Sequence, residues 1–211
     1  MPKILITCGP TWVAIDKVRV ISNISSGATG IAITKTALKQ GAKVTLLLGP
    51  VTESFTLKNP NLIIKRFKYF DELFTLIEQE LKTKKYDAVI HLAAVSDYRV
   101  EKISAQKIES GKNNLCLKLI PTPKIIRLIK KYDPKIFLVQ FKLEVNKDKD
   151  ELINSSYKDL LKNNSDLVVA NDLKQIKKRK HIAYIIDRTK NIKMVVTRQA
   201  LSDEIIRHIF S

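Results

Sequence analysis

A pair of serines followed by a glycine stands where a helix is predicted to begin. Ser25, Ser26 and Gly27 open a segment, residues 27–40, whose apolar residues have helical spacing and which is closed by Gly41. At such a helix start, free backbone N–H groups, small hydroxyls and the positive end of the helix dipole all face one place, which suits an anion. An ordinary serine N-cap would use the same residues, so the local pattern leaves both interpretations open.

A scaffold of alternating strands and helices must position these residues. Apolar runs predict strands over 3–8, 43–48, 62–67, 86–92, 136–141 and 167–170, and helical spacing predicts helices over 27–40, 70–81, 122–132, 149–163 and 198–210. We also expect a strand off the main sheet at 115–120, a hairpin formed by 182–187 and 192–196, and a long loop after the first strand. Repeating βα units predict an α/β fold: a doubly wound, mostly parallel, Rossmann-like sheet with helices on both faces and a small additional β element. In such a sheet, ligands bind outside the carboxyl ends of the strands.

The composition is that of one globular domain spanning residues 1–211. Apolar residues make up 45% and charged residues 28% of the chain. No apolar run approaches the roughly 18 residues of a membrane span, and no basic leader precedes the first strand. The two cysteines, Cys8 and Cys116, are too few for a disulfide scaffold or a zinc cage. We therefore expect a soluble, cytoplasmic protein without a membrane partner.

The chain is strongly basic, with 38 Lys and Arg against 21 Asp and Glu and a formal charge of +17. Such a balance suits nucleic acid or small polyanionic ligands, although a lysine-rich solvated surface would also produce it. The densest basic run, residues 174–181, is accompanied by no zinc knuckle, recognition helix or aromatic-interleaved basic stretch. We therefore expect no nucleic-acid partner, and the charge alone does not identify the ligand.

A nicotinamide cofactor is poorly supported. Gly27 and Gly30 lack the compact G-x-G-x-x-G spacing directly after the first strand. The second predicted strand ends in Gly49-Pro50, with no acidic residue placed for an adenosine ribose. An NAD(P)-dependent reductase is thus a minor alternative.

Six motifs follow one another between about Ile4 and Asp172. They are Gly9-Pro10-Thr11 with Ile15-Asp16, Val18-Arg19, Ile21-Ser22-Asn23 and Ser25-Ser26-Gly27; then residues 91–98, 107–110, 120–126, 139–144 and 170–172. In this order and spacing the chain resembles phosphopantothenate–cysteine ligase, the second enzyme of coenzyme A synthesis from pantothenate. No flavin-binding decarboxylase region precedes Met1, so we expect the stand-alone ligase rather than the fused bifunctional form.

The resemblance implies a two-step reaction. A nucleoside triphosphate activates the carboxylate of 4′-phosphopantothenate as an acyl nucleotide and releases pyrophosphate. The amine of L-cysteine then displaces the nucleoside monophosphate. The family uses CTP in most bacterial members and ATP in eukaryotic ones, with Mg²⁺ accompanying the triphosphate. We expect CTP as the co-substrate and a homodimer, and the metal ligands are left unassigned.

The resemblance also implies roles for particular residues. Asn23 matches an essential asparagine whose carboxamide can donate to an oxygen that gathers negative charge. Arg19, Asn23 and Ala94 match substrate-binding positions. Nucleotide-binding positions are matched by Gly9, Ser25, Ser26, Gly27, Ala93, Asp97, Lys107, Pro123, Lys124, Ile125, Ile126, Phe141, Lys158 and Lys162.

Two of these assignments keep alternatives open. Asp97 is placed to accept from a ribose hydroxyl or base amine, or to act through Mg²⁺. The i,i+4 spacing of Lys158 and Lys162 puts both on one helix face, where they either bracket phosphates or are simply solvated.

The chain departs from the family pattern at two positions. Gln140 stands where many members have Gly, and Lys124 stands where some bacterial members have Asp. His91 has no second metal ligand nearby and is predicted to be a packed histidine, and Cys8 is predicted to be core packing. The main alternative function is a non-catalytic nucleotide- or nucleic-acid-binding α/β module.

Overall fold

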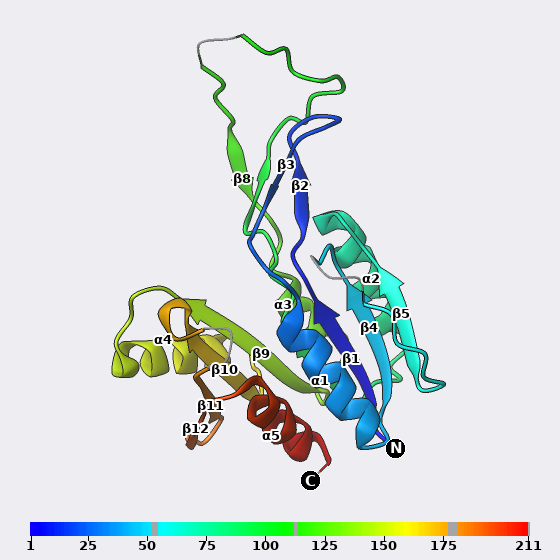
Figure 1. The fold of residues 1–211 in the computed structure, drawn as a ribbon, viewed down its shortest axis with the longest axis vertical. Helices are drawn as coiled ribbons and strands as arrows, with labels where there is room; N and C mark the ends of the chain where they lie inside the picture. The colour runs from blue at the N-terminus through cyan, green and yellow to red at the C-terminus, as the bar shows by residue number, and fades with distance from the viewer. Residues whose placement is uncertain (52–54, 112–113, 177–180, 211) are drawn as a thin grey trace.

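The fold is built on one eight-stranded sheet. The computed structural model describes residues 1–51, 55–111, 114–176 and 181–210 (Figure 1). The strand order is β12-β11-β10-β9-β6-β1-β4-β5. The bounds are β1 Lys3–Cys8, β4 Lys43–Leu48, β5 Leu62–Arg66, β6 Ala88–His91, β9 Phe137–Glu144, β10 Leu167–Asp172, β11 Ala183–Asp187 and β12 Ile192–Val195. Strands from β5 to β10 are parallel, whereas β11 and β12 add as an antiparallel hairpin. The predicted fold class is confirmed.

Burial explains why these segments form strands. β1 and β4 each expose their first lysine and bury the five residues that follow, and all six residues of β10 are buried. Near-continuous apolar runs of this kind are expected in parallel strands that are covered on both faces. β5, at the edge of the sheet, has only half-buried and exposed residues.

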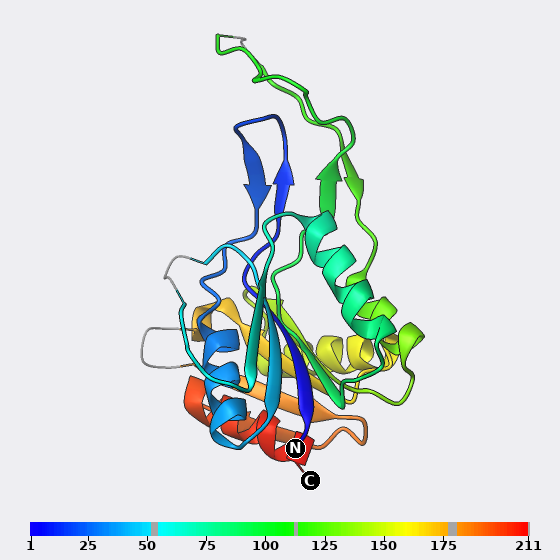
Figure 2. The same ribbon diagram turned by 90° about the vertical axis from the view of Figure 1, so that its right-hand side faces the viewer.

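Helices cover the sheet on both faces (Figures 1 and 2). The helices are α1 Ala28–Lys39, α2 Phe70–Lys82, α3 Ile125–Tyr132, α4 Lys149–Lys162 and α5 Arg198–Phe210. α1 and α5 share one core cluster with β1 and β4, exemplified by Ile33, Leu201 and Ile6. α2 and α3 pack on the opposite face through Leu73 and Ile129. α4 packs on that same face against β10 and β11.

An arm of two small hairpins projects from the sheet beyond the carboxyl ends of its strands (Figures 1 and 2). In one hairpin β2 (Trp12–Ala14) pairs with β3 (Val20–Ser22), and in the other β7 (Tyr98–Val100) pairs with β8 (Leu119–Pro121). The expectation of a continuous loop after the first strand is therefore wrong. The strand predicted at 115–120 is shorter and later, because only the last part of that segment finds a partner in β7.

The helix predicted from residue 122 begins only at Ile125. The preceding backbone is held elsewhere: Thr122 donates its N–H to Asp97 O at 2.9 Å and its hydroxyl to Ser96 O at 2.7 Å. Lys124, the residue before the helix, has an extended conformation with φ −79° and ψ 100°. Pro123 therefore lies before the helix rather than in its first turn.

The base of the arm is anchored to the segment that joins β5 to α2. Trp12 donates its backbone N–H to Lys68 O at 2.8 Å, and its ring meets Tyr69 edge-on with centroids 6.1 Å apart. The N-terminus and the end of α5 lie at the opposite end of the molecule from the arm (Figures 1 and 2). None of the helices in the described part of the chain is long and apolar enough to cross a membrane.

Candidate functional site

A cleft lies at the carboxyl ends of β1, β6, β9 and β10, where the fold class predicts a ligand. It consists of two adjoining pockets of about 440 and 690 Å³. The two share the segment Leu92–Ala94 and the segment around Phe141 as a common wall. We call them the α1 pocket and the α3–α4 pocket, after the helices that line them.

The α1 pocket is formed around the start of α1. Ser25, Ser26 and Gly27 line it, as the sequence predicts for an anion site. The N-cap residue is Gly27, with φ 73°, and no side chain caps the helix. The nearest substitute is a contact of 3.4 Å from Ala28 N to Ser26 Oγ. The ordinary serine N-cap is thus not what forms, and backbone N–H groups of the first turn are left for a ligand.

Glycines allow α1 to approach β1 closely. A Cβ on Gly27 would lie 2.5 Å from Val51 Cγ1 and 3.1 Å from Cys8 Sγ, and one on Gly30 would lie 2.6 Å from Cys8 Sγ. The Cys8 thiol donates to Gly27 O at 3.1 Å, and burial raises its pKa to about 12. Cys8 is therefore a packed thiol beneath the helix start, as predicted, and not a nucleophile.

Two residues of the α1 pocket, Arg198 and His181, are predicted by no sequence motif. Both line the pocket, and Arg198, at the start of α5, donates from Nε to Thr29 Oγ1 at 3.2 Å. His181 is buried, and burial together with the charge of Arg198 lowers its pKa. His181 closes the basic run 174–181, of which residues 177–180 fall outside the described residues. Only the fold brings these residues to α1, so no local sequence signal points to them.

The α3–α4 pocket holds Asn23, Asp97, residues 123–126 and Lys162. Asn23 Nδ2 donates to Val95 O at 3.0 Å and makes a longer contact of 3.4 Å with Ala94 O. Both contacts use the amide nitrogen. Asn23 can therefore donate an N–H to a substrate oxygen only if its longer contact, with Ala94 O, breaks and the substrate oxygen takes the place of Ala94 O.

Two predicted nucleotide-binding residues pair with each other. Lys124 Nζ lies 2.5 Å from Asp97 Oδ1, and both side chains are more than half exposed. An ion pair this exposed contributes little to stability. A ligand can therefore displace it at low cost.

Gln140 fits the floor of this pocket without opening it. Its side chain is buried, and its Oε1 accepts from Asn163 Nδ2 at 3.0 Å and from Ser165 Oγ at 2.8 Å. The neighbouring Phe141 packs toward the opposite face of the sheet, with the α1 core. The departure at Gln140 is thus accommodated by hydrogen bonds to the end of α4.

His91 is a packed, neutral histidine, as predicted. Its Nδ1 lies 2.9 Å from Thr7 Oγ1, and burial lowers its pKa to about 4. Among the residues that the structure describes, no group of three or more His, Cys, Asp or Glu side chains could hold a metal ion. Of the carboxylates lining the cleft, Asp97 is paired with Lys124, and Asp159 lies 2.9 Å from Lys142.

Three predicted residues do not line either pocket. Lys158 is exposed on α4, whereas Lys162 lines the α3–α4 pocket, so the pair expected to act together is divided. Arg19 and Lys107 belong to the arm. They are near each other, because Arg19 Nη1 donates to the carbonyl of Ile108 at 3.0 Å.

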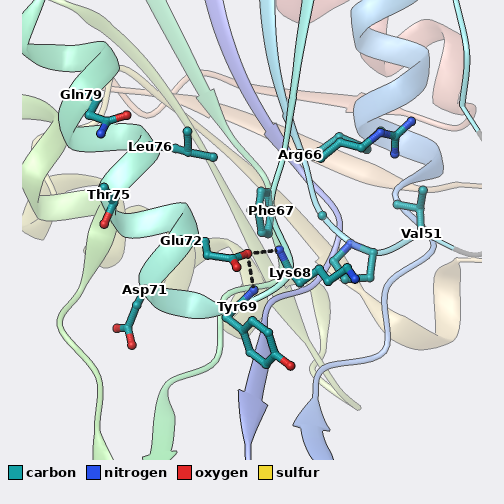
Figure 3. A pocket seen from close by; sticks show the side chains of 13 residues that line it. Val51, Arg66, Phe67, Lys68, Tyr69, Asp71, Glu72, Thr75, Leu76 and Gln79 are labelled. Carbon is teal, nitrogen blue, oxygen red and sulfur yellow. Dashed lines mark hydrogen bonds between the residues drawn. The ribbon is translucent and has the colours of Figure 1, made fainter.

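A separate cavity, of about 1000 Å³, lies between α2 and the chain segments that follow β4 and β5 (Figure 3). Phe67, Tyr69 and Leu76 line it, and Glu72 Oε2 accepts from the backbone of Lys68 at 2.6 Å. None of the predicted site residues lines this cavity. Apart from Arg19, Lys107 and Lys158, the predicted site residues line the cleft formed by the α1 pocket and the α3–α4 pocket.

Comparison with known proteins identifies the relatives. Residues 1–211 match the family described as DNA/pantothenate metabolism flavoprotein C-terminal domain. The coenzyme A biosynthesis bifunctional protein CoaBC of Thermococcus kodakarensis is 41% identical over 188 residues, which is 88% of this chain and 45% of that protein. The CoaBC protein of Methanocaldococcus jannaschii is 32% identical over 214 residues, 98% of this chain and 50% of that protein. The chain thus spans about half the length of these curated relatives.

Two solved structures of related proteins have the same fold as this chain. The crystal structure of the DNA/pantothenate metabolism flavoprotein from Streptococcus pneumoniae superposes with a TM-score of 0.92 at 32% identity, covering 100% of this chain and 99% of that one. The C-terminal domain of a CoaBC protein superposes with a TM-score of 0.80 at 26% identity, covering 99% of this chain and 93% of that one.

Proposed function

Because the chain belongs to the family of the DNA/pantothenate metabolism flavoprotein C-terminal domain, we propose that it is a phosphopantothenate–cysteine ligase of coenzyme A biosynthesis. The observation that supports this most strongly is the cleft. It gathers the uncapped helix start, Asn23, Asp97 and Lys162 from distant parts of the sequence. These are residues that the family resemblance assigns to substrate and nucleotide.

The proposed reaction has two steps. The carboxylate of 4′-phosphopantothenate attacks the α-phosphorus of CTP, which forms an acyl cytidylate and releases pyrophosphate. The amine of L-cysteine then attacks the acyl carbon, loses a proton, and displaces CMP. The N–H groups at the start of α1, with Arg198 beside them, are suited to phosphates that carry negative charge. The preference for CTP rests on the resemblance to bacterial members.

Mg²⁺ is proposed to accompany the triphosphate. Mg²⁺ commonly binds through one or two carboxylates together with substrate phosphates and water, so a dedicated cluster of acidic residues is not required. Asp97 is the carboxylate best placed for this role, because its partner Lys124 is exposed and displaceable. The ion would supply charge neutralisation on the phosphates.

Asn23 is proposed to act on the acyl group. Its amide donates to Val95 O, which orients the side chain in the lining of the α3–α4 pocket. The N–H that makes the longer contact with Ala94 O is the one available to an oxyanion. Removing one such donor typically costs about 10²–10³ in rate.

We further propose a homodimer formed through the arms. The arm exposes large apolar side chains, which are Val18, Val20, Tyr98, Ile103, Leu115 and Leu119. Several large apolar side chains exposed on one projecting element favour an interface with a partner. Arg19 and Lys107, which the resemblance assigns to substrate and nucleotide, lie on the arm rather than in the cleft of their own chain. Pairing of two arms would bring them to the cleft of a second copy.

The proposal is tested by pyrophosphate release with CTP or ATP, each with and without phosphopantothenate. We expect release with CTP only when phosphopantothenate is present, and Asn23→Asp should form product at least about 100-fold more slowly while still binding CTP. Asn154→Asp, an exposed asparagine on α4, is the matched control and should retain wild-type rates.

Three outcomes would count against parts of the proposal. Turnover of ATP with rejection of CTP would overturn the nucleotide assignment. Product formation by Asn23→Asp within about threefold of wild type would remove its oxyanion role. Salt-sensitive nucleic-acid binding without pyrophosphate release would favour a non-catalytic binding module instead.

A further inference from the structure

A buried carboxylate helps to join the two hairpins of the arm, which are also linked by the backbone hydrogen bond from Ser104 N to Ile15 O at 3.0 Å. The side chain of Asp16, between β2 and β3, is 0% exposed and accepts four hydrogen bonds. Its Oδ1 accepts from the backbone N–H groups of Val18 and Arg19, both at 2.8 Å. Its Oδ2 accepts from Arg19 Nη1 at 2.6 Å and from Ile108 N at 3.0 Å. The carboxylate thereby connects segments 92 residues apart.

The bonds to Ile108 exceed what a local turn requires. An aspartate that only shapes a turn accepts from backbone N–H groups two or three residues later, which here are those of Val18 and Arg19. The Oδ2 atom instead binds the N–H of Ile108, and the arginine that it holds donates to the carbonyl of the same residue at 3.0 Å. Both backbone groups of Ile108 are therefore fixed relative to Arg19.

We propose that Asp16 is a positioning residue, which holds Arg19 and Lys107 together as one preorganised cationic unit. Lys107 immediately precedes Ile108, so fixing the backbone of Ile108 fixes where the lysine side chain begins. The inference rests on the proposed function in assigning Arg19 to phosphopantothenate and Lys107 to the triphosphate. The set of hydrogen bonds by which Asp16 and Arg19 hold Ile108, which we call the clamp, does not depend on the proposed function.

Arg19 keeps the capacity to bind a ligand while it is held. Only its Nη1 is engaged, and in the described part of the chain its Nε and Nη2 make no hydrogen bond. The backbone N–H of Ile108 is the main cause that lowers the pKa of Asp16 to about 2, with the amides of Val18 and Arg19 and the arginine charge adding to it. The clamp is therefore ionised throughout the neutral range and does not open by protonation.

The substitution Asp16→Asn should remove the hydrogen bonds of the clamp and retain those of the turn. Asparagine retains one oxygen for the amides of Val18 and Arg19, but its NH₂ group would face two donors, Arg19 Nη1 and Ile108 N. Without any ligand, we expect hydrogen exchange at the Ile108 amide to accelerate at least about tenfold, which corresponds to about 1.4 kcal/mol. Asp187→Asn is the matched control, since Asp187 accepts from the turn amides of Thr189 and Asn191 and does not touch the arm.

A kinetic measurement distinguishes positioning from a merely structural role. In the wild-type background, Lys107→Ala should raise KM for CTP by about 10- to 150-fold. In the Asp16→Asn background, where the lysine is already misplaced, the same change should raise it less than about threefold. Residues that act through one another give such non-additive effects, whereas independent residues give additive ones.

Each outcome decides the proposal. Unchanged exchange at Ile108 would refute the clamp, and additive effects on KM would refute the positioning of Lys107. If Asp16→Asn fails to fold, Asp16→Ser retains a turn acceptor without the second oxygen and carries the same expectations. A wild-type protein with no ligase activity would overturn the proposed function, while the exchange result would still decide whether the clamp exists.

Discussion

Gly27→Ala is expected to destabilise the protein through two separable costs. Gly27 has φ 73°, and an L-residue in this left-handed region costs about 1–2 kcal/mol. The new Cβ would also lie 2.5 Å from Val51 Cγ1 and 3.1 Å from Cys8 Sγ, well inside a normal carbon contact of about 3.5–4.0 Å. Overpacking of this kind costs about 1–3 kcal/mol. The free energy of unfolding should therefore fall by about 2–5 kcal/mol.

Two other glycines separate these costs. Gly41 follows α1 with φ 86°, and no neighbouring atom lies within 4 Å of the position that a Cβ would take, so Gly41→Ala carries the backbone cost alone. Gly41 ends the helix in a Schellman arrangement, in which Gly41 N donates to Leu38 O and Ala42 N to Ala37 O, both at 3.0 Å. Gly30 lies within α1, and its Cβ would be 2.6 Å from Cys8 Sγ, so Gly30→Ala carries the packing cost without the left-handed backbone cost, offset by the roughly 1 kcal/mol by which alanine favours a helix over glycine.

Thermal unfolding followed by circular dichroism measures all three variants. For a chain of this length, each kcal/mol lowers Tm by about 2–4 °C. We expect a loss of about 4–20 °C for Gly27→Ala and about 2–8 °C for Gly41→Ala. If Gly27→Ala loses no more than Gly41→Ala, then Val51 and Cys8 do not close over the start of α1, and the reasoning is refuted.

Further predictions concern single side chains. Lys162→Ala should raise KM for CTP by about 10- to 150-fold, whereas Lys158→Ala should leave KM unchanged, because only Lys162 lines the cleft. Equal increases in KM for the two variants in a CTP titration would contradict this difference. Burial lowers the pKa of His91 from 6.5, the value for a free histidine, to about 4 in the folded protein. Between these two pH values the unfolded chain binds a proton at His91 that the folded chain does not. The free energy of unfolding should therefore fall by up to about 1.4 kcal/mol per pH unit as the pH decreases from 6.5 to about 4. His91→Gln should remove this component of the pH dependence in urea unfolding, and an unaltered slope would exclude it. A maleimide should label exposed Cys116 and spare buried Cys8 in the native protein; labelling of both would contradict the packing of Cys8.

The sequence predicts the main sheet because its strands are long apolar runs. β1, β4 and β10 are buried along almost their whole length, and such runs identify themselves without knowledge of their neighbours. β2 and β3 are three residues each, too short for any alternation to emerge, and they exist because they pair with each other and join the sheet through Trp12. α3 begins later than helical spacing predicts, because the hydrogen bonds that hold Thr122 are tertiary.

The site shows the same division between local and tertiary information. The Ser-Ser-Gly segment and Asn23 lie between the first predicted strand and the first predicted helix, so the fold class alone predicts that they lie at the carboxyl end of the sheet, where the cleft is. The spacing of motifs along the sequence does not say how far apart they lie in space, so the location of Arg19 on the arm could not be derived from it. Asp16 accepts a hydrogen bond from Ile108, 92 residues later, and no local pattern encodes that contact.

The location of the chain ends suits attachment of the protein to a surface. Met1 and the end of α5 lie at the pole opposite the arm and the cleft, because the strands run from the one toward the other (Figures 1 and 2). If a tag at either end attached the protein to a surface, the chain ends would lie at that surface and the cleft would face the solution. Immobilisation through the N-terminus should preserve access of small molecules and leave the arm free to meet a second copy. Coupling through lysines, which are spread over the sequence, would instead orient the molecules at random and obstruct the cleft in a fraction of them.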